Sequence, residues 1–114
     1  MKKLILAAVA SVLMAAPANA AEIKIGVVLG FTGPAESLAP DMANGAELAI
    51  SEVSASGALL GGSTVTPVRG DSACIDAAAA VAVAERVITA DKVSGIMGGL
   101  CSGVTTAMLQ SVAM

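Results

Sequence analysis

The sequence predicts an α/β fold: a parallel sheet with helices on both faces, which is a three-layer, Rossmann-like arrangement. Short apolar runs typical of strands alternate with segments of helical periodicity, in the order strand, helix, strand, helix, strand, helix. Alternation at this spacing is typical of parallel strands joined by right-handed crossovers. No internal repeat or low-complexity segment interrupts the pattern.

The first strand is expected near Ile23–Leu29, a run rich in β-branched residues that ends at Gly30. The turn and breaker residues Gly33, Pro34 and Pro40 then predict a loop of roughly ten residues, because they punctuate regular structure. A loop of that length is long enough to carry function.

The next segment is predicted to be an amphipathic helix over 41–56, because its apolar residues recur at three- and four-residue steps. Gly57 follows it in the manner of a C-cap. A turn then leads to a second strand over 64–70. Because Pro67 has no N–H to donate to a neighbouring strand, we expect this strand at an edge of the sheet.

The remaining residues predict two helices separated by a third strand. Asp76 is placed to cap the second helix, and Asp91 ends its apolar stripe. The third strand is expected over 93–98. The segment that follows it is predicted to be the third helix, with Ser102 or Thr105 as its N-cap.

The composition excludes several classes of function. The chain has 114 residues, a formal net charge of −3, 1% aromatic residues and no histidine. An acidic chain with almost no aromatic side chains is unsuited to binding nucleic acid. The lack of histidine removes the commonest general base and metal ligand. We therefore expect no catalytic residue, no metal site and no cofactor.

Residues 1–20 have the features of a cleaved secretory signal peptide. Two lysines precede an apolar run, and Ala-Asn-Ala at 18–20 fits the small-x-small rule for cleavage. The alternative, a membrane span, requires a longer run than this one, which Pro17 interrupts. No cysteine follows the cleavage point, which argues against a lipoprotein anchor. We expect an exported, periplasmic chain that begins at Ala21.

Two cysteines follow the second and third strands. Because parallel strands share one carboxyl edge, Cys74 and Cys101 are expected at the same end of the sheet. In an exported chain they favour a disulfide, and the alternative is a pair of buried free thiols. If the first strand is central, a bridge has to arch over its end. Cys101 or Ser102 as a catalytic nucleophile lacks the histidine base that such residues use.

Ser102 is a candidate ligand-binding residue. In open α/β sheets, ligands bind outside the carboxyl ends of the strands. The free N–H groups and positive end of a helix there suit a small anion such as a carboxylate, and the hydroxyls of Ser102, Thr105 and Thr106 add donors. The alternative is that these residues only cap the helix. Leu38 is expected beside the same crevice, either as an apolar wall or as a packed loop residue.

Three segments resemble the amino terminus of the branched-chain amino-acid-type periplasmic binding proteins. In the first, IKIGVVLGFTGPAESLAPDMANGAELAISEVSASGALLGG, the matching motifs are Thr32-Gly33-Pro34, Asn44-Gly45-Ala46 and Gly61-Gly62. The second, DSACIDAAAAVAVAERVI, is similar to the family's D-x-x-C-D-P-x-x-A-V-x-V-A segment. The third, GGLCSGVTTA, is similar to its G-x-L-C-S-x-x-T segment. Several motifs in the right order make the resemblance specific, and it covers nearly all of residues 22–114.

The resemblance implies a type I periplasmic binding protein fold, in which two lobes close on a ligand. Residues 1–20 are then a signal peptide, and 21–114 form the N-terminal part of the first lobe, with the rest of the protein absent. It also implies a disulfide between Cys74 and Cys101. Ser102 is implied to hold the ligand's carboxylate, with Leu100 and Leu38 near the ligand and Thr105 at a further matching position.

The implied function is that of a solute-binding receptor of an ABC importer. It binds a branched-chain or other amino acid, or a related small carboxylate or amide, and delivers it to an inner-membrane permease. The full-length protein is expected to be a monomer. One alternative is a ligand-sensing ectodomain or regulator on the same fold. Another is an exported hydrolase.

Overall fold

The computed structural model describes residues 20–113. The predicted signal peptide, apart from Ala20, lies outside the described residues. The alternation of strands and helices is confirmed, and the elements in chain order are β1 Glu22–Leu29, α1 Ala39–Ala55, the 3-10 turn η1 Leu60–Gly62, β2 Thr64–Asp71, α2 Ala77–Thr89, β3 Gly95–Gly98 and α3 Ser102–Val112. Within residues 20–113, no helix combines the length and the apolar character needed to cross a membrane.

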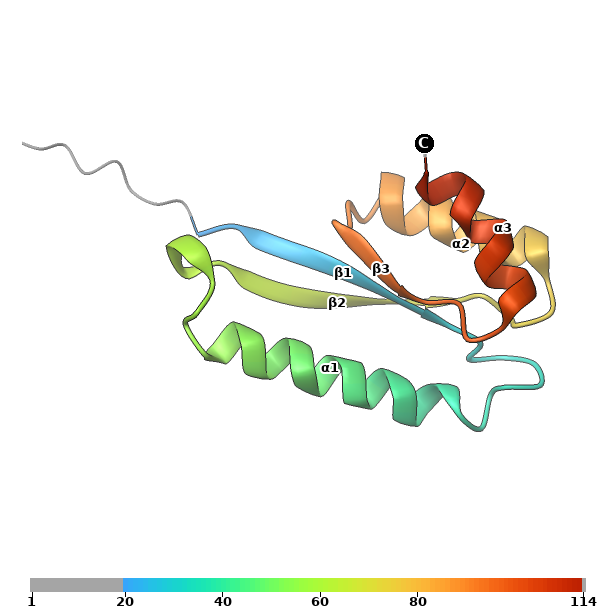
Figure 1. Ribbon diagram of the computed structural model, residues 1–114, viewed down its shortest axis with the longest axis horizontal. Coiled ribbons are helices and arrows are strands. Elements are labelled where there is room, and N and C mark those ends of the chain that lie inside the picture. The colour runs from blue at the N-terminus through green and yellow to red at the C-terminus, as the bar shows by residue number, and fades with distance from the viewer. Residues whose placement is uncertain (1–19, 114) are drawn as a thin grey trace, which may run out of the picture.

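The sheet is parallel, and its strand order is β2-β1-β3 (Figure 1). β1 is therefore central in the sheet that residues 20–113 form. β2 lies at an edge, as Pro67 predicts, because its missing N–H is tolerated where no further strand needs it. The strands end together: Leu29 is aligned with Asp71, and Val28 with Gly98.

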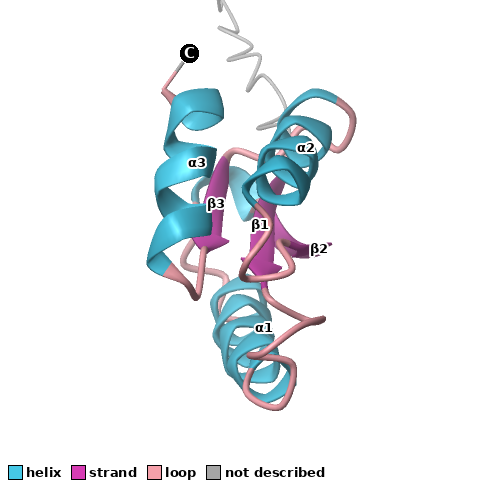
Figure 2. Cartoon of the chain, turned by 90° about the vertical axis from the view of Figure 1, so that its right-hand side faces the viewer, coloured by secondary structure: helices cyan, strands magenta, loops and turns pink. Residues whose placement is uncertain are grey.

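Helices cover both faces of the sheet, which confirms the three-layer prediction. Figure 2 shows α1 on one face and α2 with α3 on the other. Successive residues of β1 point to opposite faces. Val27 and Leu29 pack with Ala39 and Ala43 of α1, whereas Val28 packs with buried residues of α2 and α3. Two small apolar clusters, one on each side of β1, thus hold the layers together.

The start of α2 follows the prediction closely. Asp76 has an extended backbone and is the N-cap of α2. Its carboxylate accepts hydrogen bonds from the N–H groups of Ala78 at 2.9 Å and Ala79 at 3.0 Å. These two N–H groups have no partner within the helix, so the cap satisfies donors that would otherwise be orphaned.

The starts of α1 and β3 differ from the sequence prediction by two residues. α1 begins at Ala39 rather than at 41, because Pro40 lies in its first turn. There the absent N–H costs nothing, so Pro40 is compatible with the first turn of the helix and does not keep the helix from starting before it. β3 begins at Gly95 rather than at 93. Lys92 has a left-handed φ of 59° and turns the chain out of α2, so the next residues serve as a connection.

Ser72 is a buried polar residue with an expected effect on stability. Its side chain is fully buried, and within the described structure its hydroxyl has no hydrogen-bond partner. We expect Ser72→Ala to raise the free energy of unfolding by about 1 kcal/mol, because an unsatisfied buried hydroxyl is removed. Urea denaturation of the two proteins tests this, with the exposed Ser51→Ala as control. A loss of stability on Ser72→Ala contradicts the prediction.

Candidate functional site

The carboxyl ends of the three strands bring three loops to one edge of the sheet. Residues 30–38, which we call the first loop, follow β1. Residues 72–76 follow β2 and residues 99–101 follow β3, and both lead into helices. We call this side of the molecule the carboxyl edge. Ser102, Thr105, Leu100 and Leu38, the candidate ligand-binding residues, all lie on these loops or in the first turn of α3.

The N-terminus of α3 presents free backbone donors at the carboxyl edge. Cys101 is the N-cap, with an extended backbone, and Ser102 is the first helical residue. The first N–H bonded within this helix is that of Thr105, which donates to the Cys101 carbonyl at 3.0 Å. The N–H groups of residues 102–104 precede it and have no intrahelical acceptor. With the exposed Ser102 hydroxyl beside them, they form a set of donors suited to an anion.

The prediction that Ser102 or Thr105 caps α3 is wrong. The N-cap is Cys101, and within the described structure no side chain makes a capping hydrogen bond at this helix. The Thr105 hydroxyl points back into the protein, where the carbonyls of Gly99 and Cys101 are its acceptors. Thr106 likewise donates to the Ser102 carbonyl at 2.9 Å. Their single hydroxyl protons are therefore in use, which leaves the Ser102 hydroxyl as the donor among the three.

A disulfide joins Cys74 to Cys101 across the carboxyl edge. Their Cα atoms lie 5.3 Å apart, and 27 residues separate them in sequence. The bridge passes over the end of β1 at Gly30, where an added Cβ would lie only 3.0 Å from the Cys74 Cβ. The structure therefore fixes the start of α3 to the loop after β2. A disulfide sulfur carries no thiolate, so neither cysteine has the group that a thiol nucleophile needs.

The loop after β2 has an unusual backbone that the sequence did not reveal. Ala73 and Cys74 are both left-handed, with φ values of 53° and 63°. Residues other than glycine seldom adopt this conformation, which is found where surrounding contacts fix it. Here the Ala73 N–H donates to Asp71 at 2.9 Å, and the Ile75 N–H donates to the Ala73 carbonyl at 2.7 Å. This tight turn directs Cys74 toward α3.

Leu38 and Leu100 supply apolar surface near the carboxyl edge. Leu38 is 59% exposed and precedes α1 directly. Leu100 is partly buried and packs against the cluster formed by Val27, Leu29, Ala39 and Ala43. The two leucines thus belong to the α1 side of the sheet, and Leu100 lies two residues before Ser102 in the chain.

Asp71, the last residue of β2, is a site residue that sequence reasoning missed. It accepts hydrogen bonds from the Thr32 hydroxyl at 2.7 Å, the Thr32 N–H at 3.3 Å and the Ala73 N–H at 2.9 Å. Burial alone would raise the pKa of Asp71, but these hydrogen bonds outweigh it and lower the pKa below its ordinary value. The side chain is therefore an ionised carboxylate at neutral pH. It joins the first loop to the loop after β2.

Arg69 makes a second connection on the same face of β2. Its guanidinium lies 5.4 Å from the centre of the Phe31 ring, in the first loop. It also donates to Glu47 at 2.5 Å and 2.9 Å and to Asn44 at 3.0 Å, both on α1. The hydrogen bond from Arg69 lowers the pKa of Glu47. Arg69 thereby connects β2, α1 and the first loop.

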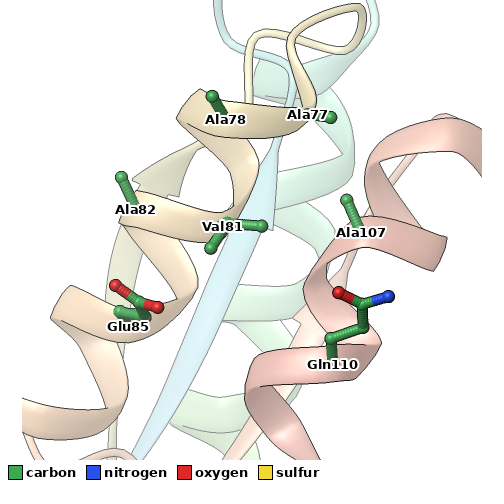
Figure 3. A pocket seen from close by; sticks show the side chains of 7 residues that line it. All are labelled: Ala77, Ala78, Val81, Ala82, Glu85, Ala107 and Gln110. Atoms are coloured by element: carbon green, nitrogen blue, oxygen red, sulfur yellow. The ribbon is translucent and has the colours of Figure 1, made fainter.

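Three hollows of the described structure lie away from Ser102. The largest of them, about 600 Å³, is an open groove between α2 and α3. Figure 3 shows its lining of mostly small side chains, with Glu85 and Gln110 from the two helices at one end. The other two lie along β3 and α3 and share Ile96. None of the three includes Ser102, Leu38 or Leu100.

The fold and the arrangement of the carboxyl edge define the class: an α/β protein of the open-sheet type with a helix N-terminus at the strand ends. The family model described as periplasmic binding protein matches residues 22–114. The chain therefore belongs to the periplasmic binding protein family. This confirms the resemblance drawn from the sequence motifs.

Relatives and solved structures agree with this family. The Leu/Ile/Val-binding protein homolog 7 of Brucella melitensis is 38% identical over 109 residues, which are 96% of this chain and 27% of that protein. The Streptococcus pneumoniae substrate-binding protein LivJ, solved in complex with isoleucine, aligns with a TM-score of 0.72 at 29% identity over 81% of this chain and 26% of its own. A solute-binding protein from R. palustris in complex with 4-hydroxybenzoate aligns at 0.67 and 26% identity, over 81% and 24%. The chain thus spans about a quarter of the length of these proteins.

Proposed function

We propose that this chain is the N-terminal part of the first lobe of a solute-binding receptor of an ABC importer. The receptor binds a branched-chain or other amino acid, or a related small carboxylate, in the periplasm and delivers it to an inner-membrane permease. The observation that carries the proposal is the N-terminus of α3 at the carboxyl edge. Ser102 is exposed there, and the first N–H groups of α3 have no acceptor within the helix. Family membership over residues 22–114 supports it.

The proposed ligand has a carboxylate on a small apolar body. The two ligands named for the solved structures, isoleucine and 4-hydroxybenzoate, share this design although their bodies differ. A helix N-terminus stabilises a carboxylate through its N–H groups and its positive end. We assign the carboxylate to the Ser102 hydroxyl and neighbouring N–H groups, and the apolar body to Leu100 and Leu38. Thr105 makes no contact with the ligand in this proposal. Its hydroxyl, bonded to the Gly99 and Cys101 carbonyls, holds residues 99–101 against the start of α3.

The remaining parts of the site are proposed to lie in a second lobe. The Brucella protein is about three and a half times as long as this chain, since the 109 matched residues make up 27% of it. A single edge exposed to solvent binds a small anion weakly, whereas closure of two lobes removes water and strengthens each charge-assisted hydrogen bond. We propose a monomeric receptor that closes on its ligand in this way.

Replacing Ser102 by alanine tests the proposal. In the full-length receptor, titration calorimetry against L-leucine, L-isoleucine, L-valine and 4-hydroxybenzoate measures the dissociation constant. We expect Ser102→Ala to weaken binding by about ten- to a hundredfold, because a hydrogen bond to a charged group is lost while the helix N–H groups remain. Ser102 is exposed, so the free energy of unfolding is expected to change little.

The matched control is Thr106→Val. Thr106 lies one turn further along α3, is exposed, and has its hydroxyl bonded to the Ser102 carbonyl. We expect this variant to bind as the unmodified receptor does. Equal binding by the Ser102→Ala and unmodified receptors contradicts the assigned role of Ser102. A full-length receptor that binds no member of the panel contradicts the proposed ligand class.

A further inference from the structure

We propose that Asp71 is a positioning residue: it fixes the first loop, residues 30–38, and thereby sets the place of Leu38 at the ligand site. This inference rests on the proposed function. Asp71 is assigned no contact with the ligand. It acts through the first loop, which connects β1 to α1 along the carboxyl edge.

The Asp71 carboxylate uses both of its oxygens to connect two loops. One oxygen accepts a hydrogen bond from the Thr32 hydroxyl, at an oxygen–oxygen distance of 2.7 Å. The other accepts the N–H of Thr32 at 3.3 Å and that of Ala73 at 2.9 Å. Thr32 is 39 residues away in sequence, so this contact is tertiary and does not arise from local turn geometry. Hydrogen bonds to an ionised acceptor are stronger than those between neutral groups, so a single side chain can hold the loop in place.

Arg69 contacts Phe31, the residue next to Thr32. Because Arg69 and Asp71 are two apart in β2, their side chains point to the same face of the sheet. Arg69 lies against the Phe31 ring, and Asp71 binds Thr32. Two successive residues of the first loop are therefore held by two side chains of one strand.

Packing beyond Thr32 transmits this position to Leu38. Gly33 has a φ of 86°, and a Cβ there would lie 2.8 Å from the Ala73 carbonyl oxygen, so the loop passes close to the neighbouring turn. Two turns follow. The Glu36 N–H donates to the Gly33 carbonyl at 3.1 Å, and the Leu38 N–H donates to the Ala35 carbonyl at 3.0 Å. With Ala35 buried, the segment from Thr32 to Leu38 has little freedom to move alone.

The test compares Asp71→Asn with Thr32→Val in the full-length receptor. Asp71→Asn keeps the side-chain shape but removes the negative charge and replaces one acceptor oxygen by an NH2 group, and Thr32→Val keeps the shape but removes the hydroxyl donor. We expect each to weaken binding of L-isoleucine, or of whichever panel member the unmodified receptor binds, by about tenfold, because a charge-assisted bond that orders the loop is lost. The double variant is expected to bind no more weakly than the weaker single variant, since both changes break the same contact. Amide hydrogen exchange of residues 35–38 is expected to be faster in all three.

Asp91→Asn is the matched control. Asp91 is a carboxylate paired with Arg86 at 2.5 Å, so the variant makes the same chemical change away from the first loop. If Asp71→Asn folds poorly, Thr32→Val alone decides, because Thr32 is exposed. Affinity for the panel ligand within about twofold of the control, or additive losses in the double variant, overturns the positioning role. If the unmodified receptor binds none of the panel, the proposed function is overturned. Unchanged amide exchange of residues 35–38 in the Asp71 and Thr32 variants then overturns the positioning role of Asp71 separately.

Discussion

Gly98→Ala should prevent the carboxyl edge from forming and lower the free energy of unfolding by more than about 4 kcal/mol. Gly98 ends β3 with a φ of 150°, a conformation that residues with a Cβ rarely adopt. An added Cβ would lie 2.7 Å from the carbonyl carbon of Val28 and closer still to its oxygen. Val28 belongs to the central, buried strand, so the backbone there has no room to shift. Urea denaturation followed by circular dichroism measures the loss.

Gly45→Ala is the control for this experiment. Gly45 lies inside α1, and an added Cβ there meets no atom within 4 Å. Alanine is the better helix residue, so we expect a gain of about 0.5–1 kcal/mol. The two glycine substitutions should therefore change stability in opposite directions. A Gly98→Ala protein that unfolds at the urea concentration of the unmodified protein would show that β3 does not end against Val28.

Removing the disulfide is expected to have the second large effect. The bridge spans 27 residues, and on the chain-entropy account it contributes about 3.5 kcal/mol by restricting the unfolded chain. We expect the double variant Cys74→Ala/Cys101→Ala to lose about that amount. Alanine is chosen because Cys74 is buried, and a serine hydroxyl there would add a separate cost. Equilibrium denaturation in urea measures the difference.

Chemical reduction provides the control for the disulfide. The unmodified protein in a reducing agent keeps both cysteine side chains and loses only the bond. Its stability should match that of the double alanine variant to within about 1 kcal/mol, since little packing separates the two. A reduced protein as stable as the oxidised one contradicts the prediction, and so does a double variant that loses less than about 1 kcal/mol.

The sequence was sufficient for those parts of the fold that depend on local pattern. Hydrophobic periodicity located each strand and helix, Pro67 placed β2 at an edge, and Asp76 marked the start of α2. The predicted start of a helix was less exact where a residue type is compatible with two local structures. Pro40 breaks a helix interior but is compatible with a first turn, which is why α1 begins earlier than expected.

The contacts that build the carboxyl edge were beyond a local reading. Asp71 and Thr32 lie 39 residues apart, and neither sits in a periodic pattern that links them. The left-handed backbone at Ala73 and Cys74 has no signal either, because neither residue is a glycine. Thr105 was expected at the helix cap from its type, yet its hydroxyl bonds to the Gly99 and Cys101 carbonyls. Such features depend on which loops the sheet brings together.

The link between Cys74 and Cys101 has a consequence for timing. Such a link forms and persists where thiols are oxidised, and a reducing cytosol keeps them apart. A chain in a reducing cytosol therefore lacks the disulfide that holds the start of α3 to the loop after β2, and the disulfide forms only in an oxidising compartment. The position of the N–H groups at the start of α3 thereby depends on the redox state of the compartment in which the polypeptide resides.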